Sequence, residues 1–276
     1  MAIQNLQDTV LLYNGVRMPG FGLGVFRVKD GDEVINSVRT ALANGYRMID
    51  TAAVYGNEQG VGQALRESGV PRNQVFVTSK VWNADQGYDS TLRAYDESLK
   101  RLDMEYLDLF LIHWPVKGKY VETWKALVQL YADKRVRAVG VSNFHIHHIK
   151  EIIDVTGVVP VIDQVELHPL LSQVELRAFC KEHAIQIEAW SPLMKGNLDL
   201  PVLHDIAKHH KKTPAQIVLR WHIQHDIVVI PKSIHEQRII ENSQVFDFSL
   251  TREEMTQIDA LHKNQRFGSD PDNFNF

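Results

Sequence analysis

The fold is decided by residues 45–58, which read GYRMIDTAAVYGNE. A short apolar run ends in an acid, a tyrosine lies in the loop that follows, and Asn-Glu opens a segment of helical character. We interpret this stretch as a strand that brings Asp50 and Tyr55 to its carboxyl end, the face on which α/β barrels carry their chemistry. Two later apolar runs end in the same way, in Lys80 and in His113.

Eight apolar runs alternate with amphipathic segments along the whole chain. The runs are continuously apolar, which is typical of parallel strands that are buried on both faces. Eight strands that are each followed by a helix predict the α/β class and a (β/α)8 TIM barrel. The runs lie at residues 21–24, 47–50, 75–81, 107–113, 136–142, 161–167, 185–190 and 227–231.

Three additions to the barrel are expected. Residues 8–19 predict an N-terminal β-hairpin around Asn14-Gly15, a strong hairpin signal, and we expect it to close the bottom of the barrel. Residues 201–210 predict an additional helical segment, and residues 252–261 predict an extra C-terminal helix. Because no linker interrupts the chain, we expect residues 1–276 to form a single domain. Expected helix caps are Ser90, Ser172, Thr213 and the capping-box pair Thr251 and Glu254.

Composition limits the possible functions. The length of 276 residues fits one barrel, and the net charge of −4 excludes a broadly basic nucleic-acid face. A single cysteine, Cys180, allows no intrachain disulfide, which fits a reducing compartment. No apolar run reaches the roughly 18 residues of a membrane span, and the first residues show no signal pattern. We therefore expect a cytoplasmic protein that binds neither membrane nor nucleic acid.

The four ionisable residues at the predicted strand ends suggest proton transfer. An ammonium group near a phenol lowers the phenol's pKa, so Lys80 could make Tyr55 a better acid. Asp50 could hold Lys80, and His113 could orient a carbonyl. Such a set suits carbonyl reduction, provided that a hydride donor lies opposite. The alternative is an ordinary ion pair beside a core histidine, and the convergence on one rim favours the functional interpretation.

Two further motifs, a glycine-rich segment and a group of histidines, resemble binding sites but have simpler structural interpretations. Residues 20–24 read GFGLG, which resembles a dinucleotide fingerprint only loosely, and we interpret them as the first barrel strand. His145, His147 and His148 resemble a metal cluster, but no carboxylate completes a ligand set in the sequence nearby. We therefore expect a solvated surface there and no metal site.

At this point the chain resembles the aldo-keto reductases. The motifs are residues 45–52, residues 107–115 and residues 230–242, and together they extend over essentially the whole chain. Residues 82–88 and 245–248 are similar to the branch that contains 2,5-diketo-D-gluconate reductase, glyoxal or methylglyoxal reductase and prostaglandin F synthase. The resemblance implies an NADP-dependent oxidoreductase that converts aldehydes and ketones to alcohols, and it implies a monomer.

The resemblance also implies residue roles. Tyr55 would be the general acid, with Asp50, Lys80 and His113 completing a catalytic tetrad. Lys232, Ser233 and Arg238 would bind the 2′-phosphate, which predicts NADPH rather than NADH. The other expected cofactor residues are Ser142, Asn143 and Gln164 at the nicotinamide carboxamide, Trp190 on its ring, Ser191 and Leu193 at the pyrophosphate, and Glu241 and Asn242 at the adenine.

The expected substrate pocket is aromatic, with Phe26, Trp82, His113 and Trp114 as its walls. Small dicarbonyls, keto-sugar acids and prostaglandin endoperoxides are all compatible with it. Two departures from the family pattern stand out. Asp163 replaces the usual asparagine before Gln164, and the short tail after Asp259 predicts a more open pocket than in members with long C-terminal loops.

Two functions from other classes remain as alternatives. A non-enzymatic nucleotide-sensing protein can share this barrel, although the four tetrad residues argue for an enzyme. A barrel hydrolase would need two facing carboxylates, and Glu166 and Glu188 are the available pair. The residues that follow them, His168-Pro169 and Ala189-Trp190, indicate structural roles for both.

Overall fold

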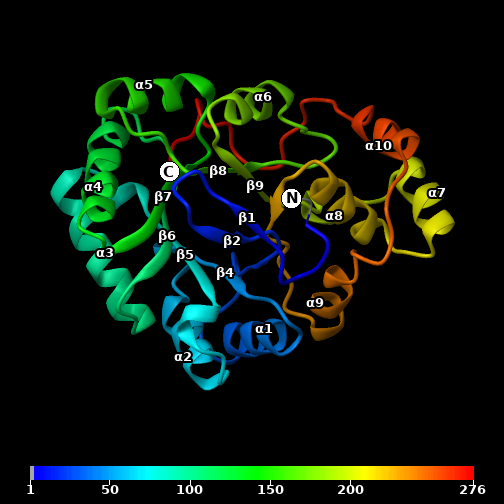
Figure 1. The fold of residues 1–276 in the computed structure, drawn as a ribbon, viewed down its shortest axis with the longest axis horizontal. Helices are drawn as coiled ribbons and strands as arrows, with labels where there is room; N and C mark the ends of the chain where they lie inside the picture. The colour runs from blue at the N-terminus through cyan, green and yellow to red at the C-terminus, as the bar shows by residue number, and fades with distance from the viewer. Residues whose placement is uncertain (1–2) are drawn as a thin grey trace.

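The computed structural model describes residues 3–276 and shows a parallel barrel surrounded by helices (Figure 1). Eight strands follow one another around the sheet in chain order, from β3 to β10, and all neighbouring pairs are parallel. The predicted α/β barrel class is confirmed. The strands are β3 (Leu23–Gly24), β4 (Met48–Asp50), β5 (Phe76–Val81), β6 (Leu107–Ile112), β7 (Val136–Ser142), β8 (Ile162–Glu166), β9 (Gln186–Trp190) and β10 (Val228–Val229).

The two ends of the sheet meet at a seam. Phe21 forms a parallel bridge with Val229, and the Gly22 amide donates a hydrogen bond to the Val229 carbonyl over 2.9 Å. The approach is close, because a Cβ on Gly24 would lie 2.8 Å from the carbonyl oxygen of Ile230. Residues 20–24 are therefore the first barrel strand, as predicted, and their glycines allow the ring to close.

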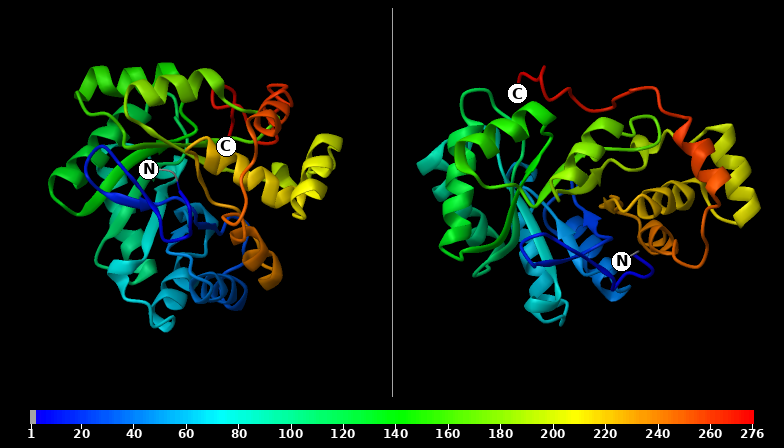
Figure 2. Two further views of the ribbon diagram at one scale, coloured as in Figure 1. Left: turned by 45° about the vertical axis from the view of Figure 1, so that its right-hand side comes forward. Right: turned by 45° about the horizontal axis from the view of Figure 1, so that its top comes forward.

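Helices follow the strands and cover the outside of the ring (Figure 2). Both additional helical segments predicted from the sequence are present, as α7 and α10. None of the helices within residues 3–276 is long and apolar enough to cross a membrane. The helices are α1 (Asp32–Ala43), α2 (Glu58–Glu67), α3 (Tyr88–Leu102), α4 (Tyr120–Ala132), α5 (Ile146–Thr156), α6 (Val174–Glu182), α7 (Pro201–His210), α8 (Pro214–Gln224), α9 (Glu236–Ser243) and α10 (Arg252–Asp259).

The N-terminal hairpin closes the amino end of the barrel, as expected. It consists of β1 (Thr9–Leu11) and β2 (Arg17–Pro19), and it lies across the strands in Figure 1. Leu12 and Met18 are buried in a cluster with Met48 and Phe76, which begin β4 and β5. A second, larger cluster fills the space between the strands and the helices. The carboxyl ends of the strands are thus the open face.

Two of the expected helix caps are confirmed and two are wrong. Thr213 and Thr251 both form capping boxes, at the starts of α8 and α10. Ser90 lies inside α3, whose cap position is Gly87, and Ser172 lies before the cap position of α6, which is Gln173. In both cases the chain enters the helix through a residue with positive φ, so tertiary packing rather than a side-chain cap sets the start.

Candidate active site

The four expected catalytic residues meet at the carboxyl end of three neighbouring strands. Asp50 ends β4, Lys80 lies in β5, His113 follows β6, and Tyr55 lies on the short 3-10 helix η1 (Ala53–Tyr55). The Lys80 ammonium donates to Asp50 Oδ1 over 2.6 Å and to the Thr51 carbonyl over 2.9 Å. It lies 5.2 Å from the centre of the Tyr55 ring. The structure therefore brings the predicted tetrad together.

Burial is the largest single influence on the pKa values of Lys80 and Tyr55. Burial disfavours the Lys80 ammonium, but Asp50, Tyr55 and Glu188 together more than compensate, so the pKa of Lys80 is raised above its ordinary value. Burial also raises the pKa of Tyr55, although Lys80 opposes the shift. The expectation of an unusually acidic phenol is therefore wrong for the protein without cofactor. Tyr55 instead stays protonated, as a proton donor must.

His113 is a neutral imidazole at the same cleft. Burial, followed by the charge of Lys80, holds its pKa well below the ordinary value. Its ring lies edge-on to Tyr55 at 5.7 Å between centroids, and its Nδ1 has no hydrogen-bond partner within residues 3–276. A neutral ring of this kind can donate one hydrogen bond to a carbonyl oxygen without competing for the proton of Tyr55.

Four of the expected nicotinamide residues form one hydrogen-bonded group at the ends of β7, β8 and β9. Ser142 donates to the Gln164 carbonyl over 2.7 Å, and the Trp190 indole donates to Asn143 Oδ1 over 2.8 Å. The Asn143 amide donates in turn to the His113 carbonyl over 2.9 Å, which links this group to the tetrad. Ser142, Asn143 and Gln164 are buried and Trp190 is partly exposed.

Glu188 joins this network, although the sequence reading set it aside as structural. The Gln164 side-chain amide donates to Asp50 Oδ2 and to Glu188 Oε2, over 2.8 Å in each case. Glu188 is fully buried, and its Oε1 is unpartnered among the described residues. Burial, followed by the charge of Asp50, raises the pKa of Glu188 to about 8. The sequence signal that could have identified it is an acid inside the apolar run 185–190, and the structure pairs it with Gln164 in the β8–β9 register.

Of the expected phosphate-binding residues, Lys232 and Ser233 lie between β10 and α9, and Arg238 lies in the first turn of α9. Lys232 and Arg238 are exposed, and neither takes part in an ion pair with an acid of the described chain. Ser233 is buried, and its hydroxyl accepts a hydrogen bond from the His235 amide over 3.1 Å, just before α9 begins. Two free cations that flank the start of a helix form a suitable anion site.

The remaining expected cofactor residues lie further along α9 and in the segment after β9. Glu241 accepts a hydrogen bond from the Thr213 hydroxyl over 2.8 Å, and Asn242 is buried one position further along α9. Ser191 and Leu193 lie in the segment that follows β9, and both are partly exposed.

The expected pocket walls carry an additional aromatic layer from the C-terminal tail. Phe26 packs on Tyr55 at 5.0 Å, and Trp82 packs on His113 at 5.2 Å. Phe276 stacks on Trp82 with 3° between the planes.

Phe274 and Phe276 also pack against Trp114, each at 5.2 Å between centroids. The tail crosses the rim in red in the right-hand view of Figure 2. The short tail thus folds back over the mouth, and a pocket more open than in members with long C-terminal loops stays a prediction.

The histidines at residues 145–148 also differ from the expectation, which held that no carboxylate lies near them. Asp272 of the tail lies against all three rings, with its oxygens 2.8 Å from His145, 3.2 Å from His147 and 3.5 Å from His148. The tail brings this acid across from the far end of the chain, so sequence proximity could not reveal it.

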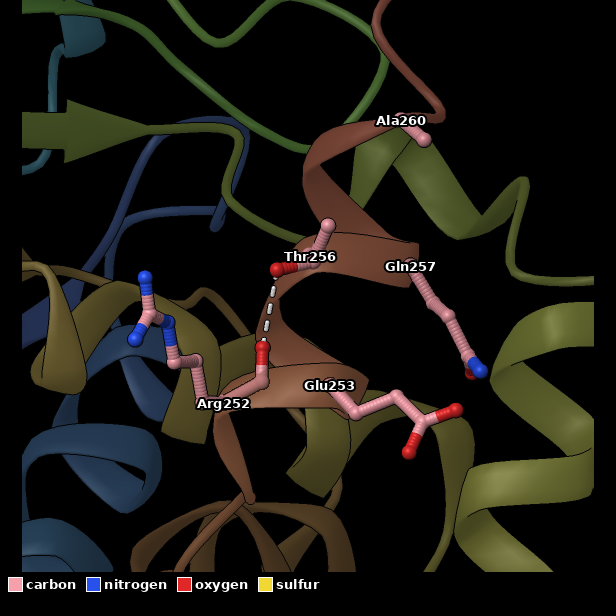
Figure 3. A pocket seen from close by; sticks show the side chains of 5 residues that line it. All are labelled: Arg252, Glu253, Thr256, Gln257 and Ala260. Carbon is pink, nitrogen blue, oxygen red and sulfur yellow. Dashed lines mark hydrogen bonds between the residues drawn. The ribbon is translucent and has the colours of Figure 1, made fainter.

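A surface hollow on α10 does not belong to this site. The five side chains that line it, shown in Figure 3, all come from one exposed helix, and none of them is an expected site residue.

Comparison with known proteins agrees with this geometry. The model of the aldo/keto reductase family matches residues 20–263, which is most of the chain. The protein belongs to the aldo/keto reductase family. It is therefore an oxidoreductase, and the resemblance predicted from its motifs is confirmed.

Individual relatives match this aldo/keto reductase over nearly their full length. Glyoxal reductase of Bacillus subtilis is 57% identical over 273 residues, which are 99% of each chain. The 9,11-endoperoxide prostaglandin H2 reductase of Trypanosoma cruzi is 58% identical over 271 residues, covering 97% of this chain and 96% of the relative. A crystal structure of a Gox0644 variant in complex with NADPH superposes with a TM-score of 0.94 at 46% identity, covering 98% of this chain and 99% of the other.

Proposed function

We propose that this protein reduces aldehydes and ketones to alcohols with NADPH, and that Tyr55 donates the proton. The observation that carries the proposal is the buried contact between Lys80 and Asp50 beneath the Tyr55 ring, with neutral His113 at the same cleft. The Bacillus subtilis relative that is named a glyoxal reductase supports the reaction type. We further propose that the chain acts as a single-domain monomer in the cytoplasm, where the free, buried thiol of Cys180 stays reduced.

The side chains at the ends of β7 and β8 fit a nicotinamide carboxamide. The Gln164 amide nitrogen is fully used by Asp50 and Glu188, whereas its Oε1 accepts no hydrogen bond from residues 3–276 and can receive a carboxamide N–H. The partly exposed Trp190 ring, held by Asn143, offers a face for stacking. A bound NADPH supplies the hydride, and these residues fix the orientation of its ring.

The proton step uses groups of the chain itself. His113 donates a hydrogen bond to the substrate carbonyl oxygen and aligns it beside the Tyr55 hydroxyl. As negative charge develops on that oxygen, Tyr55 transfers its proton, and the fixed Lys80 ammonium stabilises the phenolate that remains. Asp50 keeps the ammonium in place through the 2.6 Å contact. Because the pKa of Tyr55 is raised in the free protein, the acid is present across the physiological pH range.

Lys232, Ser233 and Arg238 are proposed to select NADPH over NADH. The exposed cations of Lys232 and Arg238, which form no ion pair within residues 3–276, would bind a 2′-phosphate through charge-assisted hydrogen bonds, and the Ser233 hydroxyl would assist them. For the carbonyl substrate we propose small dicarbonyls such as methylglyoxal or glyoxal, with keto-sugar acids as the second class. The names of the Bacillus subtilis and Trypanosoma cruzi relatives support carbonyl and endoperoxide reduction, respectively, in similar proteins.

The decisive experiment is multiple-turnover reduction of methylglyoxal with NADPH by the wild type and by Tyr55→Phe. We expect the variant to lose about 100-fold or more in kcat, the usual contribution of a positioned acid, with an unchanged dissociation constant for NADPH. Tyr88→Phe, at an exposed tyrosine on α3, is the matched control and should behave like the wild type. Near-normal turnover by Tyr55→Phe would refute the role, and absence of turnover by the wild type would favour a nucleotide-sensing protein.

A further inference from the structure

Three imidazoles at the start of α5 enclose one carboxylate of the C-terminal tail. His145, His147 and His148 come from adjoining positions, and Asp272 comes from 127 residues beyond His145. The two Asp272 oxygens lie between 2.8 and 3.5 Å from the three rings. His148 is buried, whereas the His147 side chain is 62% exposed. Neither the catalytic step nor cofactor binding uses this cluster.

The surroundings of His145 and His148 show that the protons of these two rings face Asp272. The His145 amide donates to His148 Nδ1 over 3.1 Å, and the Arg266 guanidinium lies 3.2 Å from His145 Nε2. Since these two nitrogens accept, the ring protons of His145 and His148 lie on the nitrogens that face Asp272. A metal-binding histidine shows the reverse arrangement, with its lone pair inward and its outer N–H donating to an acceptor. His145 and His148 are therefore arranged to hold a carboxylate, and His147 adds a third contact to Asp272 at 3.2 Å.

In the tail, Asp272 lies between a segment that is hydrogen-bonded to the barrel and a segment that covers the pocket mouth. Before it, the amides of Phe267 and Gly268 donate to the buried Glu166 carboxylate at the end of β8, over 2.6 Å and 3.0 Å. After it, Phe274 and Phe276 reach the aromatic mouth.

Apart from the aromatic packing, one hydrogen bond within residues 3–276 ties the chain beyond Asp272 to the barrel. It runs from the Asn83 side-chain amide to the Phe276 carbonyl over 2.9 Å, whereas the Asn273 amide donates only locally, to the Asp270 carbonyl. Asp272 is thus the main polar anchor of the segment that covers the mouth.

We propose that Asp272, held by the three histidines, is a positioning residue that determines substrate size by fixing Phe274 and Phe276 as the outer wall of the pocket. With the tail anchored, a small carbonyl compound is enclosed between this wall and the pair Trp82 and Trp114. With the tail released, the mouth loses that wall and admits bulkier carbonyl compounds. The proposal deepens the proposed reductase function and rests on it for its kinetic test.

The kinetic test compares Asp272→Ala, Phe276→Ala and the double variant with methylglyoxal and with a naphthaldehyde as the bulky probe. For Asp272→Ala we expect KM for methylglyoxal to rise by about tenfold, the factor of one charge-assisted contact, with kcat unchanged. The relative kcat/KM for the naphthaldehyde should rise. Asp272→Asn, which keeps an acceptor oxygen, should restore part of the effect. Because both residues act through one wall, the double variant should resemble the single variants rather than multiply their effects.

His209→Ala is the matched control. His209 makes the same kind of contact, with Glu254 on α10 over 2.9 Å, but it does not touch the tail beyond residue 266. We expect this variant to keep the wild-type KM for both substrates. Unchanged KM values in Asp272→Ala, or independent multiplication in the double variant, would overturn the proposal.

Two measurements are independent of catalysis. Hydrogen exchange of the amides in residues 269–276 should accelerate in Asp272→Ala and not in His209→Ala, and equal exchange would count against the anchor. Calorimetric titration of the wild type with Zn²⁺ should show no stoichiometric site that His147→Ala removes, and such a site would overturn the assignment of the rings as donors. If the exchange result holds while the wild type reduces no carbonyl compound, the reductase function fails and the anchor stands.

Discussion

Replacing Glu188 by glutamine should stabilise the protein, and the size of the effect follows from its surroundings. Glu188 is fully buried beside Asp50 and Gln164, and its pKa is raised to about 8, first by burial and then by Asp50. In the unfolded chain a glutamate titrates near 4.5. At pH 7 the unfolded glutamate is about 2.5 pH units above its pKa, so it must take up a proton when the chain folds. This protonation lowers the free energy of unfolding by about 3 kcal/mol.

The sign of the pH dependence is fixed by the raised value. Between about pH 4.5 and pH 8 the folded protein binds more protons at Glu188 than the unfolded chain does, so the stability falls as pH rises. Glutamine resembles the protonated acid and still accepts from Gln164. The free energy of unfolding of Glu188→Gln should thus exceed that of the wild type by up to about 3 kcal/mol at pH 7, and the two values should be equal near pH 4.5.

The assay is urea unfolding at half-unit steps from pH 4.5 to 8, with the slope m compared at each pH. Glu166→Gln is the matched control, because hydrogen bonds from His168 and two tail amides outweigh burial and lower the pKa of Glu166. A lowered value contributes stability above the unfolded pKa that is lost only as pH falls, so this control should be destabilised at pH 7. A Glu188→Gln variant that gains nothing at pH 7, or whose gain does not vanish toward pH 4.5, would refute the reasoning.

Three further predictions concern the phosphate site, a buried acid and the seam. Arg238→Ala should raise KM for NADPH by about tenfold or more and leave KM for NADH nearly unchanged in steady-state kinetics, whereas equal changes would contradict a 2′-phosphate contact. Asp163→Asn should raise the urea concentration at the midpoint of unfolding at pH 8. Burial raises the pKa of this carboxyl well above its ordinary value, and its Oδ2 is unpartnered among residues 3–276. A lower midpoint would contradict this. Gly24→Ala should lower the free energy of unfolding by about 1–3 kcal/mol in the same assay, because its Cβ would lie 2.8 Å from the Ile230 carbonyl oxygen, and an unchanged value would show that the seam adapts.

The barrel could be predicted because its strands are buried on both faces and so appear as uninterrupted apolar runs. Even β3 and β10, with two residues each, were found, since the glycines of residues 20–24 and the apolar run at 227–231 mark them. The tetrad positions followed from the same logic, because a polar residue at the end of a buried parallel strand must lie on the barrel rim.

Features that depend on distant packing could not be predicted. The pKa of Tyr55 is decided by how completely the folded chain excludes water, and no local pattern records that quantity. The tail has no periodicity, so its path over the mouth and the meeting of Asp272 with His145 had no sequence signal. Glu188 gave a weak signal, because an acid in an apolar strand can be a structural residue as readily as a member of a site.

The seam between Phe21 and Val229 has a consequence for the protein during its synthesis. The first strand leaves the ribosome about 200 residues ahead of the strand that covers its free edge, so a partly made chain exposes unpaired amides and carbonyls in the meantime. Nascent chains that end before residue 229 should therefore be the species that chaperones bind and that aggregate most readily. When the last strand emerges from the ribosome and pairs with the first, the open sheet with its unpaired edge becomes a closed ring.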